Sequence, residues 1–243
     1  MAPGEVLRPV LPGPMTRTRG RFCLRIGPAA CAAAHEARRK MVSAGEIVAL
    51  QDRLTRLWHE TPEGDEPSAG AWLDLVARQH RANFDLWHIE DEARAPRVSD
   101  AELAAVKRRI DQTNQLRNDL AELLDRKLLE WLAPQGLPKC EAAQNSESPG
   151  LIIDRLSILA LKIYHTREET ERKAAPEGHA DRNEARLRVL IEQRDDLAAC
   201  LDALWRDTVN GARCFKLYRQ MKMYNDPALN PAIYGDSAGE KGR

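Results

Sequence analysis

Carboxylates and one histidine gather in the stretch NFDLWHIEDEAR. Asp85, His88 and Glu92 follow one another at spacings of three and four residues, so a helix would place them on one face. Carboxylate and imidazole groups on successive turns are ligands that helical bundles use for divalent metals. We take His88, Glu90 and Asp91 as candidate catalytic residues, and Asp91 also as a candidate metal ligand. The alternative is a solvated charged face that carries one incidental histidine.

Short amides and acids line one face of the segment 111–125. An exposed helix face is usually rich in Glu and Lys, because long side chains favour the helix and pair across turns. The short side chains here indicate directed hydrogen bonding instead, and an ordinary wet face is the alternative. The candidates from this segment are Asp119 as a catalytic group, Asn114, Arg117 and Asn118 as cofactor-binding groups, and Asp119 and Glu122 as metal ligands.

An antiparallel hairpin of the two helices would bring these stripes together. Carboxylate oxygens from facing helices suit hard divalent cations, so the expected metal is Mg²⁺ or Mn²⁺. Its ligands would be Asp91, Asp119 and Glu122. The Arg117 guanidinium beside them would bind a phosphorylated small molecule in bidentate fashion.

The run LIIDRLSILALKIY, residues 151–164, has 10 apolar residues out of 14, distributed around every face of a helix. Such a helix is expected to be buried, and the charges it carries then need partners. Asp154 is expected to pair with Arg117, or Arg155 with Glu122 or Asp119. We take Asp154 as a candidate catalytic residue. We take Arg155, and Asn145 just before the helix, as candidate cofactor-binding residues. A purely structural ion network is the alternative.

Apolar periodicity predicts an all-α fold, an antiparallel helical bundle of about six helices. Ser43, Ser99 and Ser148 are expected to cap three of them, and Asn210-Gly211 to end the fifth. The sequence shows no convincing strand. The expected helices span residues 43–60, 69–94, 99–131, 149–173, 182–209 and 212–224.

The last predicted helix, 212–224, is basic and aromatic. It carries Arg213, Lys216, Arg219 and Lys222. Such a helix either binds a phosphate group or docks on the acidic hairpin.

The ends of the chain differ in composition from its body. Residues 1–40 hold 8 Lys and Arg but only 2 Asp and Glu, and they show no sustained periodicity. We expect either a disordered tail or a mis-assigned start, with translation beginning near Met41. Residues 41–233 are expected to form a single helical domain, and residues 234–243 a disordered tail.

Charge and cysteine content exclude several classes of protein. Residues 41–243 hold 29 basic and 35 acidic side chains, which argues against a nucleic-acid partner, since such affinity comes mainly from neutralising phosphates. The five cysteines include no CxxC pair, so neither a zinc site built on cysteine nor a disulfide framework is expected. No run approaches the length of a membrane span. A cytoplasmic protein is the plain expectation.

Four blocks of sequence in fixed order carry a family resemblance. They are NFDLWHIEDEAR, IDQTNQLRNDL, NSESPGLIIDRLSILALKIYH and FKLYRQMKMYNDPALNP. Together they resemble a bacterial family catalogued as domain of unknown function 4254, over about residues 43–233. The run SPGLIIDRLSILALK also resembles a segment of bacterial proteins that accompany cell-surface glycan genes. The resemblance implies a cytoplasmic helical protein linked to glycan assembly, and it implies no particular reaction.

Two functions remain open at this point. In the first, a site between the hairpin and the central helix binds or acts on a phosphorylated sugar or nucleotide with a divalent metal. In the second, the chain is a non-catalytic partner of glycan-assembly enzymes, or forms a homo-oligomer. The second function predicts a large apolar surface patch rather than a polar cavity.

Overall fold

The computed structural model describes residues 41–61, 69–219 and 228–229. The chain divides into two units, Met1–Glu36 and Ala37–Arg243, and all described residues lie in the second. The expectations for residues 1–40 and 234–243 therefore fall outside the described part.

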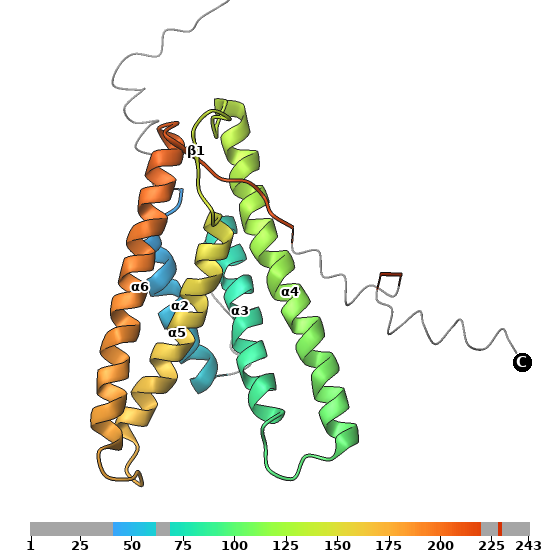
Figure 1. The fold of residues 1–243 in the computed structure, drawn as a ribbon, viewed down its shortest axis with the longest axis vertical. Helices are drawn as coiled ribbons and strands as arrows, with labels where there is room; N and C mark the ends of the chain where they lie inside the picture. Colours follow the sequence, from blue (N-terminus) through green and yellow to red (C-terminus); the bar gives the residue numbers. More distant parts are fainter. Residues whose placement is uncertain (1–40, 62–68, 220–227, 230–243) are drawn as a thin grey trace, which may run out of the picture. The chain divides into compact units, whose positions relative to one another are not determined.

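Five α-helices make up most of the described structure, which confirms the all-α prediction (Figure 1). The predicted boundaries of these five agree with the structure to within about three residues. In chain order they are α2 (Ala44–Glu60), α3 (Ala71–Glu92), α4 (Asp100–Leu132), α5 (Pro149–Glu171) and α6 (His179–Val209).

Local capping chemistry sets several of these ends. The Ser43, Ser99 and Ser148 side chains each accept a hydrogen bond from a first-turn backbone N–H, and at Ser99 the full capping box with Glu102 forms. Helix α6 ends at Asn210, and Gly211 follows with φ of 74°, the left-handed conformation that glycine adopts without strain. These ends were predicted because capping depends on neighbouring residues alone.

The predicted antiparallel hairpin of α3 and α4 is present (Figure 1), with Glu92 near the end of α3 paired to Arg109 near the start of α4, but the bundle is not antiparallel throughout. Thr55 of α2 contacts His80 of α3, and the later residue His59 contacts the later residue His88. The residue numbers increase in the same direction along both helices, so α2 and α3 run parallel. Helix α5 runs parallel to both, because Ser157 contacts His80 and His165 lies beside His88. Helices α4 (green) and α6 (orange) run in the opposite direction in Figure 1.

The last predicted helix is wrong where the structure describes it. Residues Arg213–Cys214 form a short strand, β2, that pairs in parallel with β1 (Ala143–Gln144), and residues 215–219 have no regular structure. Phe215 is buried in the core, which anchors this segment across the top of α5. Tertiary pairing thus overrides the local helical pattern of the segment.

Helix α5 lies at the centre of the core, as its all-round apolar surface predicted. Its N-terminus packs directly on α4, where the Gly150 N–H donates to Asp125 Oδ1 at 2.7 Å and the Ser148 hydroxyl donates to the same carboxylate. A Cβ on Gly150 would collide with the Ala121 carbonyl oxygen. Helix α5 can therefore approach α4 this closely only with glycine at position 150. None of the described helices has the length and apolarity to cross a membrane.

Candidate functional site

A buried carboxylate, Asp154, lies between α3, α4 and α5. Its Oδ1 accepts hydrogen bonds from Gln79 Nε2 at 2.6 Å and Asn83 Nδ2 at 2.9 Å. Arg117 Nε lies 3.4 Å from the same oxygen, which confirms the predicted ion pair between Asp154 and Arg117. Burial raises the pKa of Asp154, while Arg117 and the two amides act against this rise.

The second Asn83 hydrogen bond starts a chain of polar contacts that crosses the core to α2. Asn83 Nδ2 donates to Ser157 Oγ at 2.9 Å, and Ser157 Oγ lies 2.7 Å from His80 Nδ1. His80 Nε2 lies 2.9 Å from Thr55 Oγ1, and that hydroxyl donates its only proton to the Gln51 carbonyl. The Thr55 oxygen must therefore accept from His80 Nε2–H, which leaves Nδ1 to accept from Ser157.

His80 is consequently a neutral core residue with a fixed tautomer. Burial lowers its pKa to about 3. Trp58 stacks on the imidazole at 5.1 Å between ring centroids. The chain of contacts needs the neutral ring, because a doubly protonated ring has no nitrogen left to accept from Ser157.

A cavity of about 330 Å³ lies next to the Asp154–Arg117 pair. Glu90, Asp91 and Arg117, three of the predicted site residues, line it together. Two lining residues were not predicted from the sequence as site residues: Trp87, which forms an aromatic wall, and Arg94, which supplies a second guanidinium. The remaining lining residues are Asn83, Leu86, Ile158 and Leu161. We call this space the α3–α4–α5 cavity.

Other candidates on α4 lie outside this cavity. Asp119 is exposed and accepts a hydrogen bond from Gln115 at 2.8 Å. Asn114 and Glu122 are half-buried and Asn118 is buried, and none of the three lines the cavity. Among the described residues, Asp91, Asp119 and Glu122 do not form a group close enough to share a metal ion.

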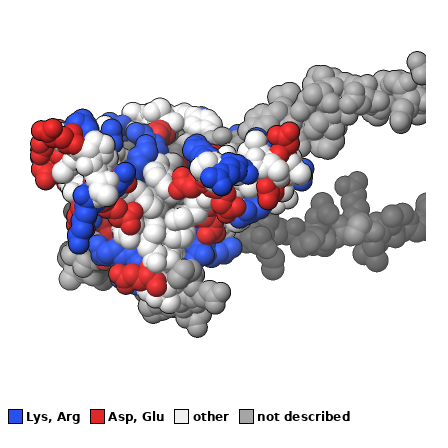
Figure 2. Space-filling model, turned by 90° about the horizontal axis from the view of Figure 1, so that it is seen from below, with Lys and Arg blue, Asp and Glu red and all other residues white. Residues whose placement is uncertain are grey.

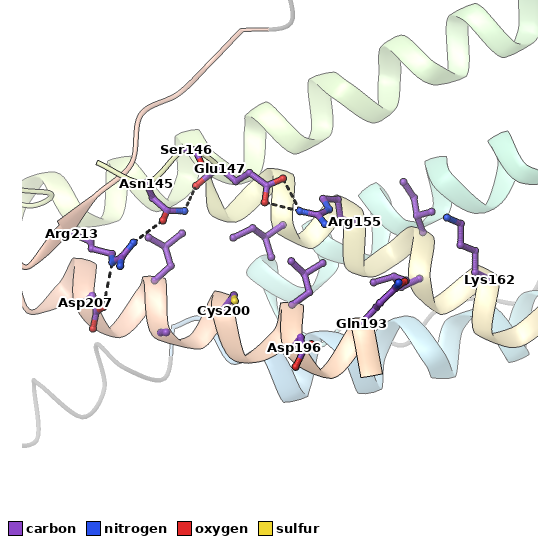
Figure 3. A pocket seen from close by; sticks show the side chains of 16 residues that line it. Asn145, Ser146, Glu147, Arg155, Lys162, Gln193, Asp196, Cys200, Asp207 and Arg213 are labelled. Carbon is purple, nitrogen blue, oxygen red and sulfur yellow. Dashed lines mark hydrogen bonds and ion pairs between the residues drawn. The ribbon is translucent and has the colours of Figure 1, made fainter. Parts of the chain in front are cut away.

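Two further candidates, Asn145 and Arg155, line a different space. It is a groove of about 850 Å³ between α5 and α6 (Figure 3). Arg155 pairs with Glu147 through 2.7 and 2.9 Å contacts, not with Glu122 or Asp119 as predicted. Arg213 donates to Asn145 Oδ1 at 3.0 Å. Helix α5 thus separates the predicted residues into two groups, because Asp154 and Arg155 project from it in different directions.

The predicted face of Asp85, His88 and Glu92 also divides. Asp85 pairs with Arg81 at 2.8 Å, and Glu92 pairs with Arg109 of α4. His88 instead turns toward α2 and α5. Both carboxylates therefore take part in ion pairs at the surface, and of these three side chains only His88 faces the interior.

Three histidines meet where His88 turns. His59 of α2, His88 of α3 and His165 of α5 each place a ring nitrogen within 4.8 Å of those of the other two. All three side chains are half-buried. Tyr164 stacks on His59 with 4.2 Å between ring centroids, and Trp87 stacks on His165 at 4.9 Å. Trp87 thus touches both this histidine cluster and the α3–α4–α5 cavity.

The Nδ1 atom of each of these rings is already engaged. His59 Nδ1 lies 2.7 Å from the Thr55 carbonyl oxygen, and His88 Nδ1 lies 2.8 Å from the Phe84 carbonyl oxygen. His165 Nδ1 lies 2.8 Å from Glu168 Oε2. Since a carbonyl oxygen only accepts, Nδ1 of His59 and of His88 carries the proton and Nε2 keeps the lone pair.

Burial and the nearby imidazoles favour the neutral form of His59. Burial lowers the pKa of His59, and His165 and His88 act in the same direction. His59 was not predicted as a site residue, and the contact between His88 and His165 was not predicted either. The available signal was that each histidine lies near the C-terminal end of its predicted helix. The sequence indicated no relative direction for α2 and α3, so nothing placed these ends together.

The end of the bundle that faces the viewer in Figure 2 shows mixed charge. Basic and acidic side chains are interspersed on it, with uncharged surface between them. The described residues on this face therefore form no broad field of one sign of the kind that binds a phosphate backbone.

Fold and site together define a class: an all-α protein with a polar cavity and a histidine cluster around a buried central helix. The family model described as Protein of unknown function (DUF4254) matches residues 73–217, more than half of the chain. The chain belongs to this family, as its four sequence blocks predicted. No curated protein and no solved structure gives a significant match to it.

Proposed function

We propose that this protein binds a phosphorylated sugar or a nucleotide in the α3–α4–α5 cavity, as an enzyme or a carrier of that ligand. The observation that carries the proposal is the convergence of Trp87, two guanidinium groups and two carboxylates on one cavity. Its volume of about 330 Å³ is in the range of small-ligand sites.

Each of these side chains has a distinct role in binding such a ligand. Arg117 and Arg94 present fork-shaped donors that match phosphate oxygens. Glu90 and Asp91 accept hydrogen bonds from sugar hydroxyls, and the Trp87 ring offers a flat apolar surface to a sugar or a base. The buried Asp154 carboxylate pairs with Arg117, so this guanidinium is already positioned before the ligand binds.

The resemblance of the Ser148–Lys162 run to proteins that accompany glycan genes favours a ligand from cell-surface glycan assembly. The alternative, a non-catalytic docking protein, has less support. The large exposed apolar side chains of the described residues are dispersed over α4, α6 and the C-terminal segment rather than gathered in one patch. They are Leu103, Leu116, Val189, Tyr218 and Leu229.

Thermal unfolding with a panel of sugar phosphates, sugar nucleotides and nucleotides tests the proposal. A ligand at 100 times its Kd adds about 2.7 kcal/mol to the free energy of unfolding, which is a rise in Tm of roughly 5–10 °C for a domain of this size. We expect at least one class to give such a rise.

Arg94→Gln is the informative variant. Arg94 is exposed and pairs with Glu90 at 3.0 Å, so its loss breaks this exposed pair but leaves the Asp154–Arg117 pair intact. We expect Arg94→Gln to reduce the rise in Tm. Arg108→Gln, an exposed arginine of α4 outside the cavity, is expected to leave the rise unchanged. If no phosphorylated compound raises Tm, or if both variants respond equally, the cavity is not the ligand site.

A further inference from the structure

We infer that His59, His88 and His165 bind one divalent transition-metal ion of the zinc class through their Nε2 atoms, with a coordination position left for an exchangeable ligand. This site is built from imidazoles rather than from the acidic stripe that the sequence indicated. It is independent of the ligand proposed for the α3–α4–α5 cavity.

The orientation of the rings is the first argument. The Nδ1 atoms contact Thr55 O, Phe84 O and Glu168 Oε2, so the nitrogen that remains on each ring is Nε2. Metal-bound histidines almost always donate their other N–H to a carbonyl or carboxylate in this way, which fixes the ring and its tautomer. Both kinds of partner are present here.

The unsatisfied nitrogens are the second argument. The Nε2 atoms of His59 and His165 are buried and have no hydrogen-bond partner among the residues that the structure describes. Buried polar atoms normally have partners, and an orphaned one calls for an explanation such as an ion. Converging lone pairs repel one another, whereas a cation placed between them gains from each.

The spacing of the rings and the position of His59 at a helix end agree with this assignment. Zn–N bonds of about 2.0–2.1 Å draw tetrahedral ligands to roughly 3.3 Å apart, and one nitrogen of each ring already lies within 4.8 Å of one nitrogen of each of the other two. Small ring rotations close that difference. His59 is in the last turn of α2, where the free carbonyl groups of the helix end attract a cation.

The donor set selects the class of metal. Neutral imidazoles suit zinc, copper, nickel and iron, whereas Mg²⁺ prefers oxygen ligands. Among the described residues this group has three histidines and no fourth cysteine, histidine or carboxylate. Three protein ligands with water in the fourth position is the arrangement of catalytic rather than structural zinc.

Metal titration of the full chain, stripped with a chelator, tests the inference. Zn²⁺ alone is measured by competition with a chromophoric chelator, and Co²⁺ alone by its visible absorption. We expect one equivalent of either metal per chain. His59→Phe, His88→Phe and His165→Phe each keep an aromatic ring in the packing, and each is expected to weaken binding on the order of 100-fold or more.

Two further variants make the result decisive. His179→Phe changes a half-buried histidine that pairs with Glu169 on α5, away from the cluster, and should bind Zn²⁺ like the wild type. Glu168→Gln removes the carboxylate behind His165 and should weaken binding about 10–100-fold with unchanged stoichiometry. Circular dichroism confirms that each variant is folded. The inference is overturned if the wild type takes up no stoichiometric metal, or if His179→Phe loses as much affinity as the three cluster variants.

Discussion

At the scale of single residues, His80 shows how a titratable group serves as a structural one. Its ring accepts from Ser157 and donates to Thr55, and it is completely buried. The unfolded chain takes up a proton at the ordinary histidine pKa of about 6.5, whereas the folded chain does so only near pH 3. The free energy of unfolding therefore falls as pH decreases below about 6.5.

His80→Gln tests this linkage. Between pH 7 and pH 5 we expect the wild type to lose about 2 kcal/mol through this group. The variant should be less stable at pH 7, since hydrogen bonds are lost, but its stability should depend less on pH in this window. Urea unfolding with a chelator present, followed by circular dichroism, measures both slopes. Equal slopes would show that His80 does not titrate as described.

At the scale of the element, Asp125 of α4 caps the N-terminus of α5 from outside that helix. It accepts from the Gly150 N–H and the Ser148 hydroxyl, yet burial raises its pKa to about 6. Between about pH 4 and 6 the folded state therefore holds a proton that the unfolded chain has released. In this window the contribution of Asp125 to stability decreases as pH rises, opposite to that of His80.

Asp125→Asn should remove that contribution. The difference in unfolding free energy between wild type and variant is expected to change by about 2 kcal/mol from pH 4 to pH 7, with the wild type relatively more stable at the acidic end. Guanidinium unfolding at several pH values measures the difference. A difference that stays constant over this range would contradict the raised pKa.

The close approach of α5 to α4 gives a sharper test with a matched control. An ideal Cβ on Gly150 would lie 2.9 Å from Asp125 Cγ and would also meet the Ala121 backbone oxygen. We expect Gly150→Ala to destabilise the protein by about 1–3 kcal/mol or more, because backbone cannot yield as a flexible side chain does.

Gly45→Ala is the control. Gly45 is also in a first helical turn, and a Cβ there meets nothing within 4 Å. This change is expected to be neutral or to stabilise by up to about 1 kcal/mol, since alanine favours the helix. Thermal unfolding of both variants measures the contrast, and a loss of equal size at the two positions would argue against the close packing of α5 on α4.

At the scale of the whole molecule, the sequence predicted what depends on local chemistry. Ser99 and Ser148 marked helix starts through their capping patterns, and the apolar run of α5 marked the core. The Asp154–Arg117 pair was predicted because a charge on a buried helix needs a partner and the hairpin offered one. Glu90, Asp91 and Arg117 were therefore found before the cavity that joins them was known.

What the sequence did not predict depends on the direction and rotation of whole helices. Nothing in the apolar pattern of α2 states whether it runs parallel or antiparallel to α3. Without that direction, His59 could not be placed beside His88, so no histidine cluster could be predicted. In the same way, residues 213–214 belong to a segment whose sequence pattern predicted a helix, but they pair with β1, which lies about 70 residues earlier in the chain.

Trp87 gives this molecule a built-in optical reporter. The indole lies against His165 on the histidine cluster and also forms part of the wall of the α3–α4–α5 cavity. The emission of Trp87 should respond to a metal ion that draws the His165 imidazole away from the indole. It should also respond to a ligand that displaces water from the α3–α4–α5 cavity. Because the chain has five tryptophans, the Trp87 response is the difference in emission between the wild type and Trp87→Phe, measured with the metal and the cavity ligand added one at a time.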